Sequence, residues 1–161
     1  MDKGTTFGIK APHHFLVHVA DCSWLLLHKW HYDGLAAPYW RFYWNGNGGA
    51  SVLLRGRRTQ LAPSRCFLIP PQTPFSARLS RPVWHFCLHF VTGPSGLQLA
   101  PGIYGFPRSG TLARMLAEIR ARLRTEREPT LRTSLLCLAL AHEALYRLPI
   151  DKLTFGRSDE R

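Results

Sequence analysis

Two histidines on an aromatic stretch are the residues of this sequence best placed to do chemistry. The run Val83–Val91 alternates two sets of side chains, and His85, Cys87 and His89 share one face if the run is a strand. On a strand that rises about 3.3 Å per residue, the two histidines begin about 13 Å apart. A single zinc ion needs its ligands within about 2.1 Å. The sequence therefore predicts no metal site here, and we expect no cofactor.

The patterns of hydrolytic and phosphate-binding sites are also missing. The first 107 residues hold only three carboxylates, Asp2, Asp21 and Asp33, and none is paired in the sequence. The segment Gly93–Gly96 has a proline where a nucleophile elbow needs a free backbone. The glycine-rich segment 45–49 leads into β-like sequence and not into a helix, so it predicts a turn between paired strands. We expect a protein that is not an enzyme and has no catalytic residues.

The same region is rich in side chains that line small-molecule pockets. Pockets combine aromatic walls with a few polar anchors, and an arginine among them pairs with an anionic or polyhydroxyl group. An aromatic side chain in such a region also suits a packed core, and Arg41 suits an outer face, so these alternatives stay open. The predicted ligand-binding residues are Arg41, Tyr43, Trp44, Phe75, His85, Cys87 and His89.

Short apolar runs separated by turn residues precede residue 107 and predict an all-β sandwich or barrel. The expected strands are 14–19, 23–30, 39–44, 51–55, 57–61, 65–69, 75–78 and 83–91. On the last of them, we expect one face to pack in the core between the sheets, and the face with the histidines to line a cavity or meet solvent. The inward-packing face consists of Trp84, Phe86, Leu88 and Phe90.

A helical period follows Pro107. One apolar face has the spacing i, i+3, i+4, i+7 of an amphipathic helix that starts near Ser109 or Thr111, and a second helix from Leu131 to Leu148 is apolar over more than half its circumference. So wide an apolar surface must bury two sides, the second of them against the neighbouring helix or a partner subunit, and we expect a helical hairpin that forms a homodimer. The predicted interface residues are Leu112, Met115, Leu116, Ile119, Leu123, Leu135 and Leu138.

Composition describes one ordinary globular domain. The chain has 161 residues, 45% apolar, with no apolar window long enough to span a membrane and no secretory signal, so we expect a cytoplasmic protein without a membrane partner. Its four cysteines lack the short spacing of zinc or redox motifs, which predicts reduced and mostly buried thiols. The net charge of +11 divides into +7 up to residue 107 (10 basic, 3 acidic) and +4 after it (11 basic, 7 acidic). Direct binding of nucleic acid by this scattered charge is a further alternative.

Two segments of the chain resemble the sensor domains of AraC-family transcriptional regulators. The run Gly56–Phe75, with its Pro70–Pro71 corner, is similar to a characteristic stretch of those domains, and Trp84–Phe90 is similar to the aromatic strand that follows it. With the two helices after them, the resemblance covers roughly residues 38–148. It implies a mainly β, cupin-like jelly roll (a double-stranded β-helix) followed by a C-terminal pair of amphipathic helices that dimerise. It also implies a small-molecule effector, often a sugar.

The resemblance further implies residue roles and a domain division. His85 matches a histidine that contacts the effector, but Cys87 stands where a stacking aromatic is usual, so Tyr43 or Trp44 would have to supply that wall. Phe75 and Ala77 also depart from the family pattern. The implied units are a ligand-binding barrel at 1–107, a dimerising hairpin at 108–150, and the start of a linker at 151–161. The resemblance further implies DNA binding through a C-terminal helix-turn-helix region, which we expect to be absent from this chain. The runner-up is a metal-dependent cupin enzyme of the isomerase or dioxygenase type.

Overall fold

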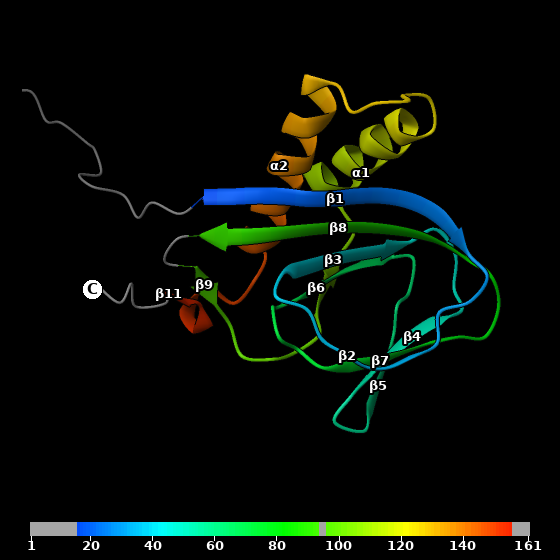
Figure 1. Ribbon diagram of the computed structural model, residues 1–161, viewed down its shortest axis with the longest axis vertical. Helices are drawn as coiled ribbons and strands as arrows, with labels where there is room; N and C mark the ends of the chain where they lie inside the picture. Colours follow the sequence, from blue (N-terminus) through cyan, green and yellow to red (C-terminus); the bar gives the residue numbers. More distant parts are fainter. Residues whose placement is uncertain (1–15, 94–95, 156–161) are drawn as a thin grey trace, which may run out of the picture.

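Two antiparallel sheets face each other in the computed structural model, which describes residues 16–93 and 96–155 (Figure 1). The larger sheet has the strand order β1 (Leu16–Leu27), β8 (Val83–Gly93), β3 (Trp40–Asn45), β6 (Arg65–Ile69) and β10 (Tyr104–Pro107). The smaller sheet has the order β2 (Tyr32–Leu35), β7 (Phe75–Leu79), β4 (Ala50–Leu54) and β5 (Arg57–Gln60). Of the residues that the structure describes, 43% lie in strands and 24% in helices, so the predicted mainly β class is confirmed.

The helix pair covers the outer face of the five-stranded sheet, over β1 and β8 (Figure 1). The first helix, α1 (Gly110–Leu123), follows Ser109, and the second, α2 (Leu131–Tyr146), begins after Thr130, whose hydroxyl accepts a hydrogen bond from the Thr133 amide. The outer face of the sheet and the inner faces of both helices form one continuous apolar cluster. The barrel and the hairpin therefore share a core.

Three residues of the predicted dimer interface belong to that core. Leu112, Leu116 and Ile119 are fully buried against the sheet, so they are not available to a partner subunit. Met115 and Leu123 are half-buried beside them, whereas Leu135 is 56% exposed and Leu138 is half-buried. The prediction was wrong for the three buried leucine and isoleucine side chains, because the apolar face of α1 packs on its own sheet.

The alternating side chains of β8 belong to two different cores. Phe86, Leu88 and Phe90 pack under the helices, and not between the sheets as predicted. Cys87, on the opposite face, packs with Tyr43 and Phe75 in the core between the two sheets. Trp84 is 45% exposed. The two apolar sets of one strand cannot be assigned to a layer from alternation alone when both faces are covered.

A β-bulge interrupts the pairing of β1 with β8. Val19 lies opposite Phe90 and Asp21 lies opposite His89, so Ala20 is the extra residue. One inserted residue exchanges the two faces of a strand. As a result Val19 and Cys22 both face the helices, and Asp21 faces the inside of the sandwich beside His89. The two strands predicted at 14–19 and 23–30 are one strand, and residues 14 and 15 lie outside the described residues.

Several connections differ from the expectation. The turn at 45–49 does not join paired strands, because β3 and β4 belong to different sheets. After the short 3-10 helix η1 (Ile150–Lys152), β11 (Thr154–Phe155) pairs with β9 (Leu97–Gln98), in a segment expected to begin a linker. Residues 156–161 of that segment lie outside the described part.

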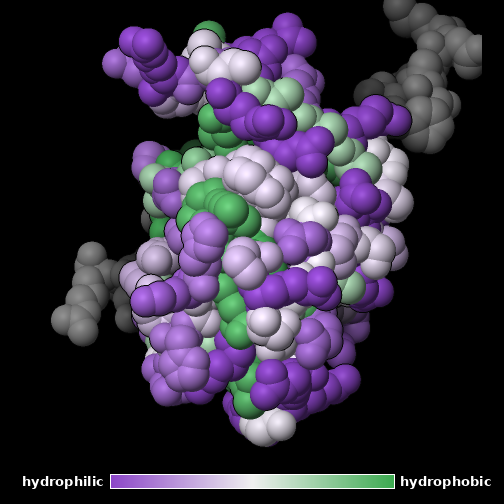
Figure 2. Space-filling view, turned by 90° about the vertical axis from the view of Figure 1, so that its right-hand side faces the viewer, coloured by the Kyte–Doolittle hydropathy of each residue, from purple (hydrophilic) through white to green (hydrophobic). Residues whose placement is uncertain are grey.

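The surface is mixed in character. Figure 2 shows hydrophilic side chains spread over one face of the molecule, with hydrophobic ones between them. Within residues 16–93 and 96–155, no helix is long and apolar enough to cross a membrane.

The packing of α2 predicts different costs for the same substitution on its two sides. Leu140 is fully buried and Leu131 is 76% exposed. We expect Leu140→Ala to lower the free energy of unfolding by about 2–5 kcal/mol, because it leaves a cavity under the helix. Leu131→Ala serves as the matched control and should change it by less than about 0.5 kcal/mol. Urea unfolding followed by circular dichroism measures both, and equal losses would show that α2 does not pack by this face.

Candidate functional site

Six of the seven predicted ligand-binding residues lie on one surface inside the sandwich. On β3 and β8 the register pairs Arg41 with His89 and Tyr43 with Cys87, so alternation turns all four to the same side. Phe75 begins β7 in the opposite sheet and packs against the Tyr43 ring, with ring centres 6.4 Å apart. His85 is 4.7 Å from the same ring. We call this group of six, Arg41, Tyr43, Phe75, His85, Cys87 and His89, the inner cluster.

Trp44 does not belong to the inner cluster. It follows Tyr43 on β3 and therefore faces the helix side, where its ring stacks on Trp24 at 5.2 Å. Its indole nitrogen donates to the Pro63 carbonyl oxygen at 2.9 Å, and the Arg120 guanidinium lies 5.7 Å from its ring. The prediction that Trp44 lines the same pocket as Tyr43 was wrong, because adjacent strand residues point to opposite faces.

Four further residues contact the inner cluster and were not predicted as site residues. Trp30 lies 5.0 Å from the His85 ring, and Tyr39 lies 4.8 Å from the His89 ring. Asn45 shares the inward face of β3 with Arg41 and Tyr43 and lies opposite His85 on β8. The alternation of residues along this strand could have predicted its position. Asp21 reaches His89 only because of the bulge at Ala20, which no sequence pattern indicates.

The buried charge of Arg41 dominates the electrostatics of this surface. Its exposure is 2%, and its guanidinium lies 5.0 Å from the Phe75 ring and 5.4 Å from the Tyr39 ring. Its one hydrogen bond among the described residues runs to the Leu35 carbonyl oxygen at 3.4 Å. No carboxylate within residues 16–93 and 96–155 forms an ion pair with it. An arginine stays charged inside a protein, so this site holds a cation for which the described part of the chain supplies no counter-ion.

His85 is held neutral and in one tautomer. Burial lowers its pKa to about 3, so the ring carries no charge at neutral pH. Its Nδ1 lies 2.7 Å from the Asn45 side-chain oxygen, while the Asn45 amide nitrogen donates to the Leu61 carbonyl oxygen at 3.3 Å. Nδ1 therefore carries the proton, and Nε2 is left as a hydrogen-bond acceptor.

Asp21, Cys87 and His89 form the polar side of the site. The Asp21 carboxylate lies 3.7 Å from His89 Nδ1, and the Cys87 thiol donates to it at 4.0 Å. Burial lowers the pKa of His89 against the opposing effect of Asp21, and burial raises the pKa of Cys87, so both groups are neutral at pH 7. Within the described part of the chain, the buried Nε2 of His89 has no hydrogen-bond partner.

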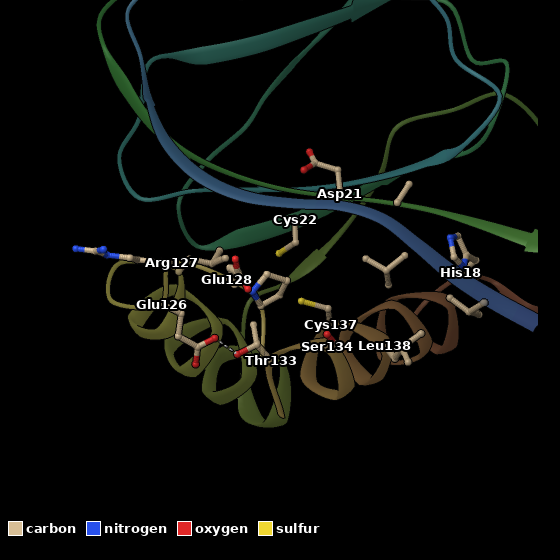
Figure 3. A pocket seen from close by; sticks show the side chains of 15 residues that line it. His18, Asp21, Cys22, Glu126, Arg127, Glu128, Thr133, Ser134, Cys137 and Leu138 are labelled. Atoms are coloured by element: carbon tan, nitrogen blue, oxygen red, sulfur yellow. Dashed lines mark hydrogen bonds between the residues drawn. The ribbon is translucent and has the colours of Figure 1, made fainter. Parts of the chain in front are cut away.

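Two pockets lie outside the inner cluster. The first, of about 550 Å³, is a groove between β1 and the helix pair, with Cys22 and Cys137 on its walls (Figure 3). The second, of about 360 Å³, lies at β5, β6 and the segment 102–105, and Phe67, one of its lining residues, also packs in the core between the sheets. Neither opens at the rings of the inner cluster, which contact one another.

Known structures with the same arrangement of elements include ToxT from Vibrio cholerae. A 1.65 Å structure of ToxT matches with a TM-score of 0.55 and 11% identity, over 91% of this chain and 61% of ToxT. The structure of ToxT with an unsaturated fatty acid bound matches equally well over 59% of its length, and an apo form of a ToxT variant matches with a TM-score of 0.51. No protein-family model and no curated protein sequence matches the chain.

The chain spans about three-fifths of the length of ToxT, and the likeness at 11% identity concerns the fold. Its two facing sheets, with a helix pair on the outer face of the larger one, are the cupin-like fold of the N-terminal domain of ToxT, a regulator of the AraC family.

Proposed function

We propose that this chain is the small-molecule-sensing and dimerisation domain of an AraC-type transcription regulator, and not an enzyme. The observation that carries the proposal is the buried Arg41 guanidinium, which has no carboxylate partner among the described residues and lies between aromatic rings. A buried cation without a counter-ion destabilises a protein unless an anion binds to it. In such a regulator, DNA binding belongs to a helix-turn-helix region outside this chain, and the domain works in the cytoplasm.

The chemistry of the inner cluster favours an acid with an apolar or aromatic body as the effector. Arginine binds a carboxylate with two parallel hydrogen bonds, and the surrounding rings of Tyr39, Tyr43 and Phe75 suit an apolar chain or a planar group. A neutral sugar has less support, because Cys87 offers no ring for stacking. One of the similar ToxT structures holds a bound unsaturated fatty acid, which is an acid of this kind.

An effector gains access to Arg41 by displacing rings from the inner cluster. Trp30 and Tyr39 lie in the segment between β1 and β3, and the strand within it, β2, pairs with β7 at two positions only, with an irregular register between them. Few backbone hydrogen bonds hold this edge, so it opens at a lower free-energy cost than the centre of the sheet. The ring pairs of Trp30 with His85 and Tyr39 with His89 are those that a ligand replaces.

The same strands connect the inner cluster to the helices. On β8, Cys87 and His89 face the effector, while Phe86, Leu88 and Phe90 contact the helix side. A change in strand position on binding therefore reaches α1 and α2 directly. Effector binding would bias the helix pair between two arrangements by as much as its affinities for the two differ.

Replacing Arg41 tests the anion site. We expect Arg41→Met to leave the free energy of unfolding unchanged or to raise it by about 1–4 kcal/mol, because an unpaired buried charge is removed. It should abolish stabilisation by acids, which for the wild type is about 2.7 kcal/mol at a hundredfold excess over Kd. The measurement is thermal unfolding against long-chain unsaturated fatty acids, aromatic acids and sugar acids, each with its uncharged ester or parent sugar.

Arg57→Met on β5 is the matched control for that experiment, because Arg57 is exposed. It should respond to every compound as the wild type does. Equal stabilisation of the wild type by an acid and its ester, or an unchanged response of Arg41→Met, would remove the role of Arg41.

The dimerisation part of the proposal rests on an exposed apolar stripe of α2. Leu131, Leu135, Leu138 and Tyr146 recur at helical spacing, and three of the four are more than half exposed. The opposite side of α2 is buried in its own chain. An exposed apolar stripe on a helix is typical of a helix-to-helix interface between subunits.

A charge on this stripe should separate the subunits. We expect the wild type to be a dimer and Leu135→Glu to dimerise at least about tenfold more weakly, a change of about 1.4 kcal/mol, because it places a carboxylate in an apolar interface. Light scattering during size-exclusion chromatography over a concentration series measures this. Ala117→Glu, on the exposed side of α1, is the control and should remain dimeric. A wild type that is monomeric at every concentration contradicts the proposal.

A metal-dependent cupin enzyme is the second candidate, and one observation favours it. The carboxylate of Asp21, the thiol of Cys87 and a ring nitrogen of His89 lie within 4.8 Å of one another, and these are ligand types that zinc accepts. Against it stands the Arg41 guanidinium on the same inner surface, which repels a divalent cation.

Metal content separates the two candidates. We expect the purified protein to contain iron, zinc and manganese only in traces, and cobalt titration to give no absorption band from a thiolate bound to the metal. One metal ion per chain, lost in both Cys87→Ser and His89→Ala, would favour the enzyme. Elemental analysis and absorption spectroscopy on the same preparation provide both readouts.

A further inference from the structure

Two cysteines from distant parts of the chain face each other in the groove between β1 and α2. Cys22 lies on β1 just after the bulge, and Cys137 lies in the middle of α2. Both line the 550 Å³ groove, and Figure 3 shows their sulfur atoms pointing toward one another from its two sides. Asp21, next to Cys22, points away from the groove in the same view. The bulge at Ala20 therefore also places the Cys22 sulfur opposite α2.

The two thiols are neighbours on opposite walls of the groove. Their proximity lowers the pKa of Cys137, while Cys137 and burial raise the pKa of Cys22. Cys137 is thus the thiol of the pair that ionises first. A thiolate is the form of cysteine that attacks oxidants, so the pair contains one nucleophile and one neighbouring thiol to trap its product.

The groove gives small oxidants access to this pair and not to the other two cysteines. Cys22 is partly exposed, and Cys137 contributes to the wall of the groove although little of it is exposed. Cys66 is fully buried, and burial raises its pKa to about 12. Cys87 is buried between the sheets, with its thiol against the Ser23 hydroxyl at 3.0 Å. Neither Cys66 nor Cys87 lines the groove.

We propose that Cys22 and Cys137 form a reversible disulfide that ties α2 to β1 when the protein meets a peroxide. The Cys137 thiolate attacks one peroxide oxygen, the O–O bond breaks, and the departing hydroxide takes a proton to become water, which leaves a sulfenic acid on Cys137. The Cys22 sulfur then attacks the Cys137 sulfur, loses its proton, and the sulfenic oxygen leaves as a second water. Two thiols and one peroxide give one disulfide and two waters, and each sulfur loses one electron.

The bond has a structural consequence that does not depend on the identity of an effector. It covalently joins the sheet to the helix that bears the exposed apolar stripe, across the groove that now separates their surfaces. In the reduced protein, apolar side chains of both elements pack α2 against β1 without a covalent bond between them. The disulfide would therefore fix the position of α2 on the sheet and bridge two walls of the groove.

The sequence allows a direct test on the full chain. Trypsin places the four cysteines on separate peptides, with Cys22 on residues 11–29 and Cys137 on residues 133–147. Reduced protein is treated with hydrogen peroxide, free thiols are blocked with N-ethylmaleimide, and the digest is analysed by mass spectrometry. We expect a cross-linked peptide 11–29/133–147, an intact mass lower by about 2 Da, and recovery of both thiols with dithiothreitol.

Single substitutions of the four cysteines identify which two thiols form the disulfide. Cys22→Ala and Cys137→Ala should each abolish the cross-link, with Cys137→Ala also stopping formation of the sulfenic acid, while Cys66→Ala and Cys87→Ala should retain the cross-link. The peptide map of the wild type decides the question even if a variant does not fold. Oxidation without the 11–29/133–147 cross-link, cross-links through Cys66 or Cys87, or links only between chains would overturn the proposal.

Discussion

Burial of the five-stranded sheet on both faces is the constraint on which the rest of the structure depends. The central strands β3 and β8 contribute side chains to two cores. Phe42 and Leu88 pack on the helix side, while Tyr43 and Cys87 pack toward the smaller sheet. With no solvated face, a central strand cannot shift without repacking both layers. The same central strands therefore contribute side chains to the inner cluster and to the core under the helix pair. A displacement of one of these strands changes the packing on both sides of the sheet.

The bulge at Ala20 interrupts the regular pairing of β1 with β8, and it lets β1 place polar and apolar side chains on the faces that suit them. Without it, the alternation of Val17 and Val19 would carry Asp21 under the helices and turn Cys22 into the sandwich. A carboxylate under the helices would lie among apolar side chains, at a high desolvation cost. One extra residue places Asp21 beside His89 and Cys22 beside Cys137, and so creates the polar side of the inner cluster and the thiol pair together.

The sequence predicts the elements of this fold better than it predicts their surroundings. Strands such as 65–69 and 83–91 and both helices lie where periodicity places them, because each has a clear spacing of apolar residues. Periodicity says which residues share a face and not what that face meets. For this reason it does not show that Trp44 lies apart from the inner cluster, or that Leu112 packs on its own sheet and not on a partner subunit. The bulge and the short strands β2, β9 and β11 leave no periodic signal at all.

The charge of Arg41 explains why a site can exist where the rings already contact one another. Burial of a guanidinium costs on the order of several kcal/mol, and the faces of Tyr39 and Phe75 offset only part of this. Under the proposed sensing role, an anion that binds beside Arg41 would relieve this cost, so an acid would gain affinity that an uncharged analogue of the same shape would not. The apolar rings would then select the body of the ligand, and the buried charge would select its head group. Such a domain would distinguish ligands by charge before any conformational change in the helices contributes.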